Sequence, residues 1–288
     1  MSFKIITDSS CDFTKAQYEE LGLRYAPLTL LYKGEQHDSF TEEKELKSFY
    51  NGIRDGEMPT TSAVNPEGWV SVMEPVLAAG EDVLALCFTS GLSTTYQSAV
   101  IAASELQEKY PHRKIRVVDT LCAALGQGLL VWYACRKRDQ GLDLDAVAQW
   151  VEDNKLRLCH WVTVDDLDHL KRGGRVSATT AFVGGLLNIK PIIHVDNDGK
   201  LDTVGKVRGR KAAMEYLVKQ MAATASADEN ETITIAHGDC PEDAAALEAL
   251  VRKSCPYVKN VITGYVGGVI GAHTGPGVLV LFFLGSQR

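Results

Sequence analysis

Short apolar runs with strand character alternate with helical patterns along most of this 288-residue chain. Strands are predicted at residues 3–7, 83–88 and 115–118, and helices at residues 66–79 and 95–109. Residues 83–88 are almost entirely apolar, which is typical of a parallel strand buried on both faces. The alternation therefore predicts an α/β fold whose N-terminal part contains a mainly parallel sheet.

The pattern changes near residue 158. Residues 189–195 and 200–207 are predicted strands joined by Asp198-Gly199, a dipeptide typical of a tight hairpin turn. An antiparallel hairpin in an otherwise alternating chain predicts a second domain with a mixed sheet, so we divide the chain into two α/β domains, 1–158 and 159–288. The other elements expected in the second domain are strands at 159–164, 232–236, 258–263 and 278–284 and helices at 210–223 and 242–254. In the first domain, residues 25–32 are expected to form one extended segment, residues 59–62 a loop and residues 121–138 a long helix.

Composition limits the partners and the compartment of the chain. The formal net charge is −7 and no block of basic residues occurs, so neither nucleic acid nor an anionic lipid surface is expected as a partner. The longest apolar run, residues 278–284, is too short to span a bilayer, and the N-terminus has no readable secretory signal. The seven cysteines are scattered and odd in number, which favours reduced thiols in the cytoplasm.

Polar side chains follow three predicted strands, at residues 7–10, 89–95 and 119–120. Because ligands of open α/β sheets bind beyond the carboxyl ends of strands, these segments could together form a neutral cradle for an anion. Helix capping by the same Ser, Thr and Asp residues is the alternative. Near the C-terminus, glycines surround His273, which implies residues with positive φ or a close approach of the backbone to other groups. The sequence leaves open whether His273 has a structural or a functional role.

Eight segments in order resemble the DegV family of bacterial fatty-acid-binding proteins, over essentially the whole chain. The segments are ITDSSCD, PTTS, SGLSTTYQSA, VVDTLCAALGQG, LKRGGRVS, LLNIKPII, KVRGRKAA and HTGPG. The resemblance implies two α/β domains with a palmitate-like long-chain fatty acid in a tunnel between them, no other cofactor, and a lipid-binding protein rather than an enzyme. Some members present the lipid to a fatty acid kinase, so the resemblance also implies such a kinase as a partner.

Carried over residue by residue, the head-group contacts of the family fall on Thr61, Ser93 and His273, with Ser62 and Thr94 beside them. Arginines that dock the kinase match Arg175 and Arg208. The sequence departs from the family at Thr94, where glycine is common, and at Ala63-Val64-Asn65, where Gln-Pro-Ser is usual. Residues 181–189 and 278–284 are apolar segments that either line the tunnel or belong to the core.

Rival functions have weaker motifs. A serine-dependent acyl hydrolase using Ser93 and His273, with Asp119 or Asp8, is the alternative, although the segment 91–95 lacks the closing glycine of a nucleophile elbow. Neither a phosphate-binding loop nor a dinucleotide fingerprint is present. His160, Asp165, Asp166 and His169 cluster without the spacing of a metal site, so a solvated acidic helix is expected there and no metal.

Overall fold

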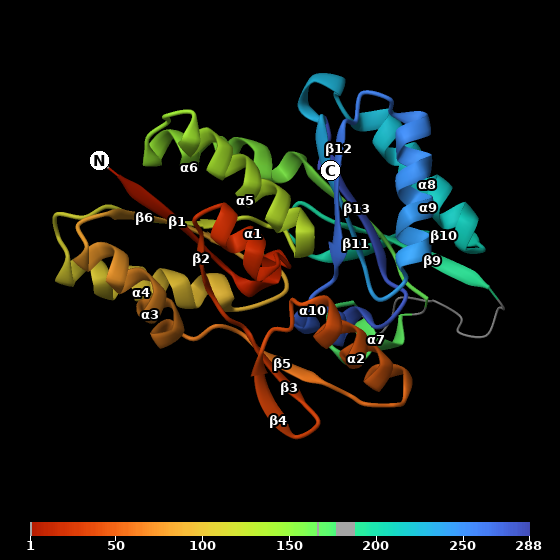
Figure 1. The fold of residues 1–288 in the computed structure, drawn as a ribbon, viewed down its shortest axis with the longest axis horizontal. Coiled ribbons are helices and arrows are strands. Elements are labelled where there is room, and N and C mark those ends of the chain that lie inside the picture. The colour runs from red at the N-terminus through yellow and green to blue at the C-terminus, as the bar shows by residue number, and fades with distance from the viewer. Residues whose placement is uncertain (1, 166, 177–187) are drawn as a thin grey trace.

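A computed structural model describes residues 2–165, 167–176 and 188–288. The first sheet has the order β2-β1-β6-β7 and all of its strands are parallel. They are β1 (Phe3–Asp8), β2 (Arg24–Ala26), β6 (Asp82–Cys87) and β7 (Ile115–Asp119). The predicted parallel sheet is confirmed, and it occupies the left of Figure 1.

Helices cover both faces of this sheet. On one face lie α3 (Pro66–Ala78) and α4 (Thr95–Lys109), and on the other lie α5 (Ala124–Asp139) and α6 (Leu144–Asn154). Because successive side chains of a strand point to opposite faces, β6 supplies Leu84 and Leu86 to the α5–α6 side and its other apolar residues to the α3–α4 side.

The second sheet is mixed and has the order β10-β9-β8-β13-β11-β12. Its strands are β8 (Leu158–Thr163), β9 (Ile189–Val195), β10 (Leu201–Arg208), β11 (Thr232–His237), β12 (Asn260–Tyr265) and β13 (Leu279–Leu284). Only the β11–β12 pair is parallel among these described strands. The helices α8 (Arg210–Thr224) and α9 (Pro241–Ser254) pack on its outer face. The predicted hairpin is confirmed, whereas β12 begins two residues later than expected.

A third, small antiparallel sheet lies at the bottom of Figure 1, in the order β4-β3-β5. Its strands are β3 (Thr29–Tyr32), β4 (Glu35–Asp38) and β5 (Thr60–Ser62), and α2 (Glu43–Arg54), α7 (Asp168–Arg172) and α10 (Gly268–Thr274) lie nearby. Two predictions are wrong here. Residues 59–62 are not a loop, because Thr60–Ser62 pairs with β3, and residues 25–32 are two strands in different sheets. Pro27 separates the two strands, because proline cannot donate a ladder hydrogen bond.

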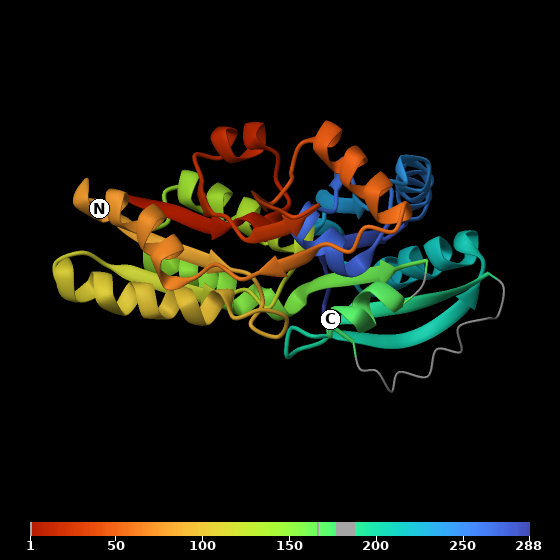
Figure 2. The same ribbon diagram turned by 90° about the horizontal axis from the view of Figure 1, so that it is seen from below.

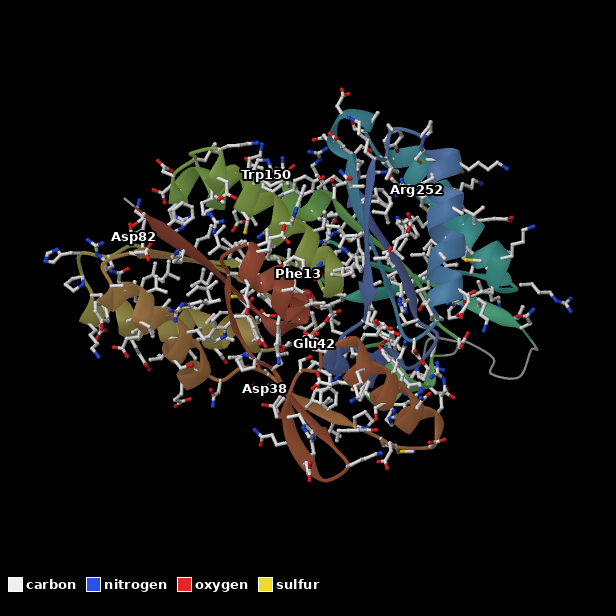
Figure 3. The ribbon with its side chains drawn as sticks, viewed as in Figure 1. Phe13, Asp38, Glu42, Asp82, Trp150 and Arg252 are labelled. Atoms are coloured by element: carbon white, nitrogen blue, oxygen red, sulfur yellow. The ribbon has the colours of Figure 1, made fainter. Side chains whose placement is uncertain are left out.

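The hydrophobic core continues across residue 158 through α5, which packs against both large sheets. Gly126 faces His160 and Phe282 of the mixed sheet, and Gly128 faces Phe13 of the N-terminal half. In Figure 1, α5 runs from the N-terminal half toward β11 and β13, Figure 2 shows the two halves side by side, and Figure 3 places Phe13 near the middle of the molecule. A division of the chain at residue 158 therefore stays a prediction, and the packing does not break there.

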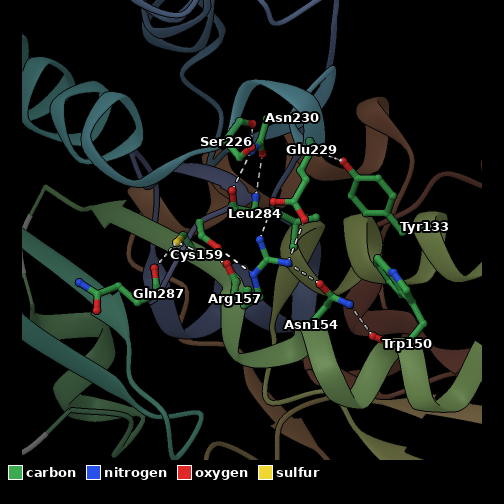
Figure 4. Close-up of polar contacts among 11 residues, drawn as sticks. Tyr133, Trp150, Asn154, Arg157, Cys159, Ser226, Glu229, Asn230, Leu284 and Gln287 are labelled. Atoms are coloured by element: carbon green, nitrogen blue, oxygen red, sulfur yellow. Dashed lines mark hydrogen bonds and ion pairs between the residues drawn. The ribbon is translucent and has the colours of Figure 1, made fainter.

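Polar contacts join the same halves at the top of the molecule (Figure 4). The Arg157 guanidinium, in a short 3-10 helix (Lys155–Arg157), donates to Glu229 at 2.9 and 2.5 Å and to Asn154 at 2.8 Å. Glu229 is the last residue of another 3-10 helix, Ala227–Glu229, and its carbonyl oxygen accepts a hydrogen bond from the Tyr133 hydroxyl group at 2.8 Å.

The remaining elements of the N-terminal part are a short 3-10 helix (Ser9–Cys11) and α1 (Lys15–Glu20).

All seven cysteines carry free thiols, and six of them are buried. Within the described residues, no helix combines the length and the apolar character that crossing a membrane requires.

Candidate functional site

A cavity of about 420 Å³ lies between the two large sheets, next to α10. This volume falls in the range of small-molecule pockets. The polar residues that line it come from β5, the loop before α4, the segment after α7, and α10. They are Thr61, Ser62, Ser90, Ser93, Thr94, Arg175, His273 and Thr274, and His160 joins them from β8. Aliphatic and aromatic side chains form most of the remaining wall. The cavity therefore combines a cluster of hydroxyl, imidazole and guanidinium groups with a long apolar surface.

Thr61 and His273 meet in this cavity although they are 212 residues apart in sequence. The Thr61 Oγ1 and His273 Nε2 atoms are 2.7 Å apart, within hydrogen-bond distance. Burial, and then the charges of Arg175 and Arg172, lower the pKa of His273 to about 4. The imidazole is thus neutral at pH 7. Gly173 packs directly on its Nδ1 side, where any Cβ would collide with the ring.

Ser93 and Thr94 stand at the N-terminus of α4. The Ser93 Oγ lies 2.9 Å from Thr95 Oγ1 and accepts from the amide of Thr95, the first residue of the helix, at 3.2 Å. The N-terminal amides of α4 place a partial positive charge at the same point. Thr94 lines the cavity with an exposed side chain.

The two arginines predicted to dock a kinase lie in different places: Arg175 lines the cavity and Arg208 does not. Arg175 lines the cavity, is half-buried, and donates to the Leu92 carbonyl at 3.3 Å beside Ser93. Burial lowers the pKa of its guanidinium. Arg208 is exposed at the end of β10, opposite Ile189, and does not line the cavity.

The expected cradle of three polar strand ends is wrong for two of them. The segments 7–10 and 119–120 do not line the cavity, because their side chains satisfy backbone groups instead. Asp8 is buried and accepts from the Phe88 amide at 2.7 Å and from Ser10 and Gln127. Burial raises the pKa of its carboxyl group despite these bonds. Asp8 caps the short helix Ser9–Cys11, as the capping interpretation expects, whereas Asp119 and Thr120 bond backbone groups without capping a helix. Only the segment 90–94 faces the cavity.

The contacts of the catalytic candidates do not form a serine hydrolase relay among the described residues. Ser93 bonds Thr95, and His273 Nε2 bonds Thr61. Asp119 Oδ1 accepts from the amides of Ser90 and Leu121, and Asp8 is held in its own buried network.

Of the residues considered for a metal site, Asp165 and His169 line one small cavity, and His160 lines a different one. His160 forms part of the cavity wall, with Nδ1 against the Leu158 carbonyl at 3.0 Å and Nε2 accepting from the Ala123 amide at 3.1 Å. Asp165 pairs with Lys190, and Asp166 lies outside the described residues. The described part of the chain contains no cluster of three or more potential ligands for a metal ion.

Strands of the mixed sheet form one side of the apolar wall. In β13 and the residue before it, Val278, Val280 and Phe282 face the cavity, whereas the residues between them pack against α8 and α9. The segment 278–284 is thus half wall and half core. Residues 181–187 of the other expected segment lie outside the described residues, and Ile189 does not line the cavity. Sequence reasoning missed wall residues such as Val195 and Leu201, although the strand alternation around the Asp198-Gly199 turn contained that signal.

Comparison with known proteins gives one consistent result. The model of the family described as "Uncharacterised protein, DegV family" matches residues 2–285. A DegV domain-containing protein of Clostridium perfringens is 44% identical over 99% of this chain and 98% of its own length. Among solved structures, a DegV family protein from Thermus thermophilus, described by its fatty acid binding, superimposes with a TM-score of 0.88, with 32% identity over 99% of this chain and 100% of that one. DegV of Bacillus subtilis, described as a fatty acid binding protein, has a TM-score of 0.84 and 28% identity over 99% of both chains. The resemblance seen in the sequence is confirmed, and the chain belongs to the DegV family.

Proposed function

We propose that this protein binds one long-chain fatty acid, with the acyl chain against the apolar wall and the carboxylate at Thr61, Ser93 and His273. The observation that carries the proposal is the composition of the cavity, in which a small polar cluster adjoins a long aliphatic surface. The binding described for the Thermus thermophilus and Bacillus subtilis relatives supports the same ligand class.

The free energy of binding comes mainly from the acyl chain. Burying about 14 methylene groups at ~0.8 kcal/mol each contributes roughly 11 kcal/mol. Ordering of the chain and loss of translational freedom offset a large part of this gain. The polar cluster therefore has to orient the carboxylate rather than supply the affinity, and neutral donors are sufficient for that role.

The hydrogen bond between Thr61 and His273 favours a specific arrangement of protons. When neutral His273 donates from Nε2 to Thr61 Oγ1, the hydroxyl hydrogen of Thr61 is left for the carboxylate. Ser93 supplies a second hydroxyl at the positive end of α4, where helix amides attract anions. Ser62 and Thr94 complete the rim of the cluster.

We further propose that the protein presents the acid to a fatty acid kinase in the cytoplasm. In that reaction the carboxylate oxygen attacks the terminal phosphorus of ATP, so that an acyl phosphate and ADP form on the kinase. This chain would be a lipid-binding protein that performs no chemistry itself. Arg208, exposed on β10, is the proposed docking contact, and Arg175 lies at the cavity itself.

Native mass spectrometry of the protein purified from bacteria tests the ligand. We expect an excess mass of one fatty acid per chain, identified after extraction. The lipid is then removed and palmitate affinity is measured for Thr61→Val and Ser93→Ala, each expected to weaken binding about tenfold, which corresponds to ~1.4 kcal/mol for one lost hydrogen bond. Asn65→Ala is the matched control, because Asn65 caps α3 without lining the cavity.

Unchanged affinity in both variants would contradict the assigned carboxylate site, and a protein that neither carries nor takes up fatty acid would contradict the ligand class. Labelling of Ser93 by a fluorophosphonate would favour the hydrolase instead. For the partner, Arg208→Ala should leave palmitate binding unchanged and reduce phosphorylation by a fatty acid kinase. Full phosphorylation of the lipid held by this variant would remove Arg208 from the docking surface.

A further inference from the structure

The fatty acid cavity has a distal end, which lies away from the pair of Thr61 and His273. Val278, which follows α10, and Phe282 both face the cavity, and the rise of a strand places them about 13 Å apart. Phe282 is paired with His160 of β8. The distal end is the part of the wall formed by Ala123, Ala124, His160, Val195 and Phe282.

The Arg288 guanidinium lies directly behind this distal end. Its Nη2 atom donates to the Leu121 carbonyl at 2.7 Å and to the Lys155 carbonyl at 2.8 Å. Its Nη1 atom donates to the Asp196 carbonyl at 2.7 Å, and its Nε atom donates to the Leu158 carbonyl at 3.1 Å. Hydrogen bonds from a charged donor are stronger than neutral ones, so one side chain holds these four backbone segments together.

Most of the carbonyls that Arg288 binds belong to backbone next to the wall. Burial, and then the charge of Arg288, lower the pKa of His160, which agrees with a guanidinium close behind that ring. Loss of the guanidinium would therefore release the backbone on which the distal end is built. The neighbouring positions are Leu121, two residues before Ala123; Leu158, two residues before His160; and Asp196, directly after Val195.

The backbone at the distal end is also strained. Leu121 and Ala124 have φ values of 52° and 54°, in the left-handed region that is uncommon for residues other than glycine. Such a conformation persists only where the surrounding structure holds it. Arg288 holds the Leu121 carbonyl, and His160 Nε2 accepts from the amide of Ala123, between the two strained residues. Without Arg288, this segment loses one of these two supports and can relax away from the cavity.

We propose that Arg288 is a positioning residue that fixes the distal end and so limits the length of the fatty acid that binds. The inference rests on the proposed function, and it restricts the substrate class to acyl chains that end before this wall. Each further methylene group that fits in the cavity stabilises the complex. A methylene group that meets a fixed wall has to displace closely packed groups, which destabilises it. Affinity should therefore rise with chain length and then fall.

The affinities of a series of saturated fatty acids for the lipid-free full chain test the inference. The series runs from laurate through myristate, palmitate and stearate to arachidate. For the wild type we expect affinity to rise and then to fall about tenfold at the first acid that is too long. In Arg288→Ala the same acid should bind at least as tightly as its shorter neighbour. This ratio compares two acids on one protein, so a general loss of stability does not change it.

Arg157→Ala is the matched control. It removes a guanidinium from the same junction, but that guanidinium binds Glu229 and Asn154. Arg157 does not line the cavity, so this variant should keep the length profile of the wild type. Thr61→Val should weaken the binding of every acid by the same factor and leave the position of the fall unchanged.

An unchanged length profile in Arg288→Ala would overturn the inference, as would an equal change in Arg157→Ala. A wild-type affinity that still rises at arachidate would also overturn it, because the distal end would then not be fixed. If Arg288→Ala does not fold, Arg288→Lys decides, since one ammonium group cannot hold all four carbonyls; a fall as large as in the wild type would then refute the inference. Failure at the distal end leaves binding and the effect of Thr61→Val intact, whereas absence of binding for every acid would contradict the proposed function as well.

Discussion

The protonation of His273 should make the stability of the lipid-free protein depend on pH. Burial lowers the pKa of this histidine from 6.5 to about 4 in the folded state. Between these two values the unfolded chain binds a proton that the folded chain does not, so the free energy of unfolding falls as the pH falls. Between pH 7 and pH 5 this one group removes about 2 kcal/mol of stability.

Urea unfolding of lipid-free wild type and His273→Gln at pH 7 and pH 5 measures this contribution. The variant should lose about 2 kcal/mol less than the wild type over that interval, because glutamine does not titrate. Other groups with shifted pKa values, such as Asp12 and His237, are present in both proteins and cancel in the difference.

Bound fatty acid should reduce the difference, because a carboxylate beside the imidazole raises the pKa of His273 toward its ordinary value. An equal loss of stability in wild type and His273→Gln would refute the description of His273 as a buried neutral group. A difference that palmitate leaves unchanged would show that the carboxylate binds away from this ring.

Three further predictions concern other parts of the molecule. Arg175→Ala should raise the pKa of His273, followed by NMR titration of the imidazole, because the positive charge of Arg175 now lowers it; no change would place that charge too far from the ring. Gly126→Ala should destabilise the fold by about 1–3 kcal/mol in urea, since its Cβ would come within 2.5 Å of buried side chains, whereas Gly205→Ala has room and should not. Arg157→Ala should cost about 1 kcal/mol, because its ion pair with a carboxylate is partly exposed; a much larger loss would indicate that the whole junction depends on it.

Periodic elements were predictable from the sequence, and elements without a period were not. The hairpin around Asp198-Gly199 combines an alternating pattern with a specific turn dipeptide, and both signals are local. The strand Thr60–Ser62 has three residues, too few to show alternation, and its existence depends on pairing with a distant partner. The helix Gly268–Thr274 was obscured by the glycines in it and just before it, which are required by close contacts. A Cβ at Gly271 would meet the Tyr50 hydroxyl group, and one at Gly267, the residue before the helix, would meet the Asp12 carboxyl group.

Only the residues of the candidate site that lie in motifs of the family could be predicted from the sequence. Thr61, Ser93 and His273 came from the family resemblance, and they line one cavity. Asp8 and Asp119 share their position at strand ends with Ser93, yet they turn toward backbone amides. No local pattern distinguishes a capping side chain from one that faces a cavity, because the difference depends on packing between distant segments.

The position of α5 limits how a ligand could enter. In a clamshell protein, two lobes joined by a flexible linker swing apart to release their cargo. Here α5 belongs to the hydrophobic core of both halves of the chain. In addition, the Thr89 hydroxyl group donates a hydrogen bond to the Gly199 carbonyl oxygen, which joins the N-terminal half to the turn between β9 and β10. Separation of the two halves would break the contacts of α5 with one of the two large sheets. For the proposed fatty acid we therefore expect entry and release by local opening at the rim of the cavity, while the rest of the molecule keeps its shape.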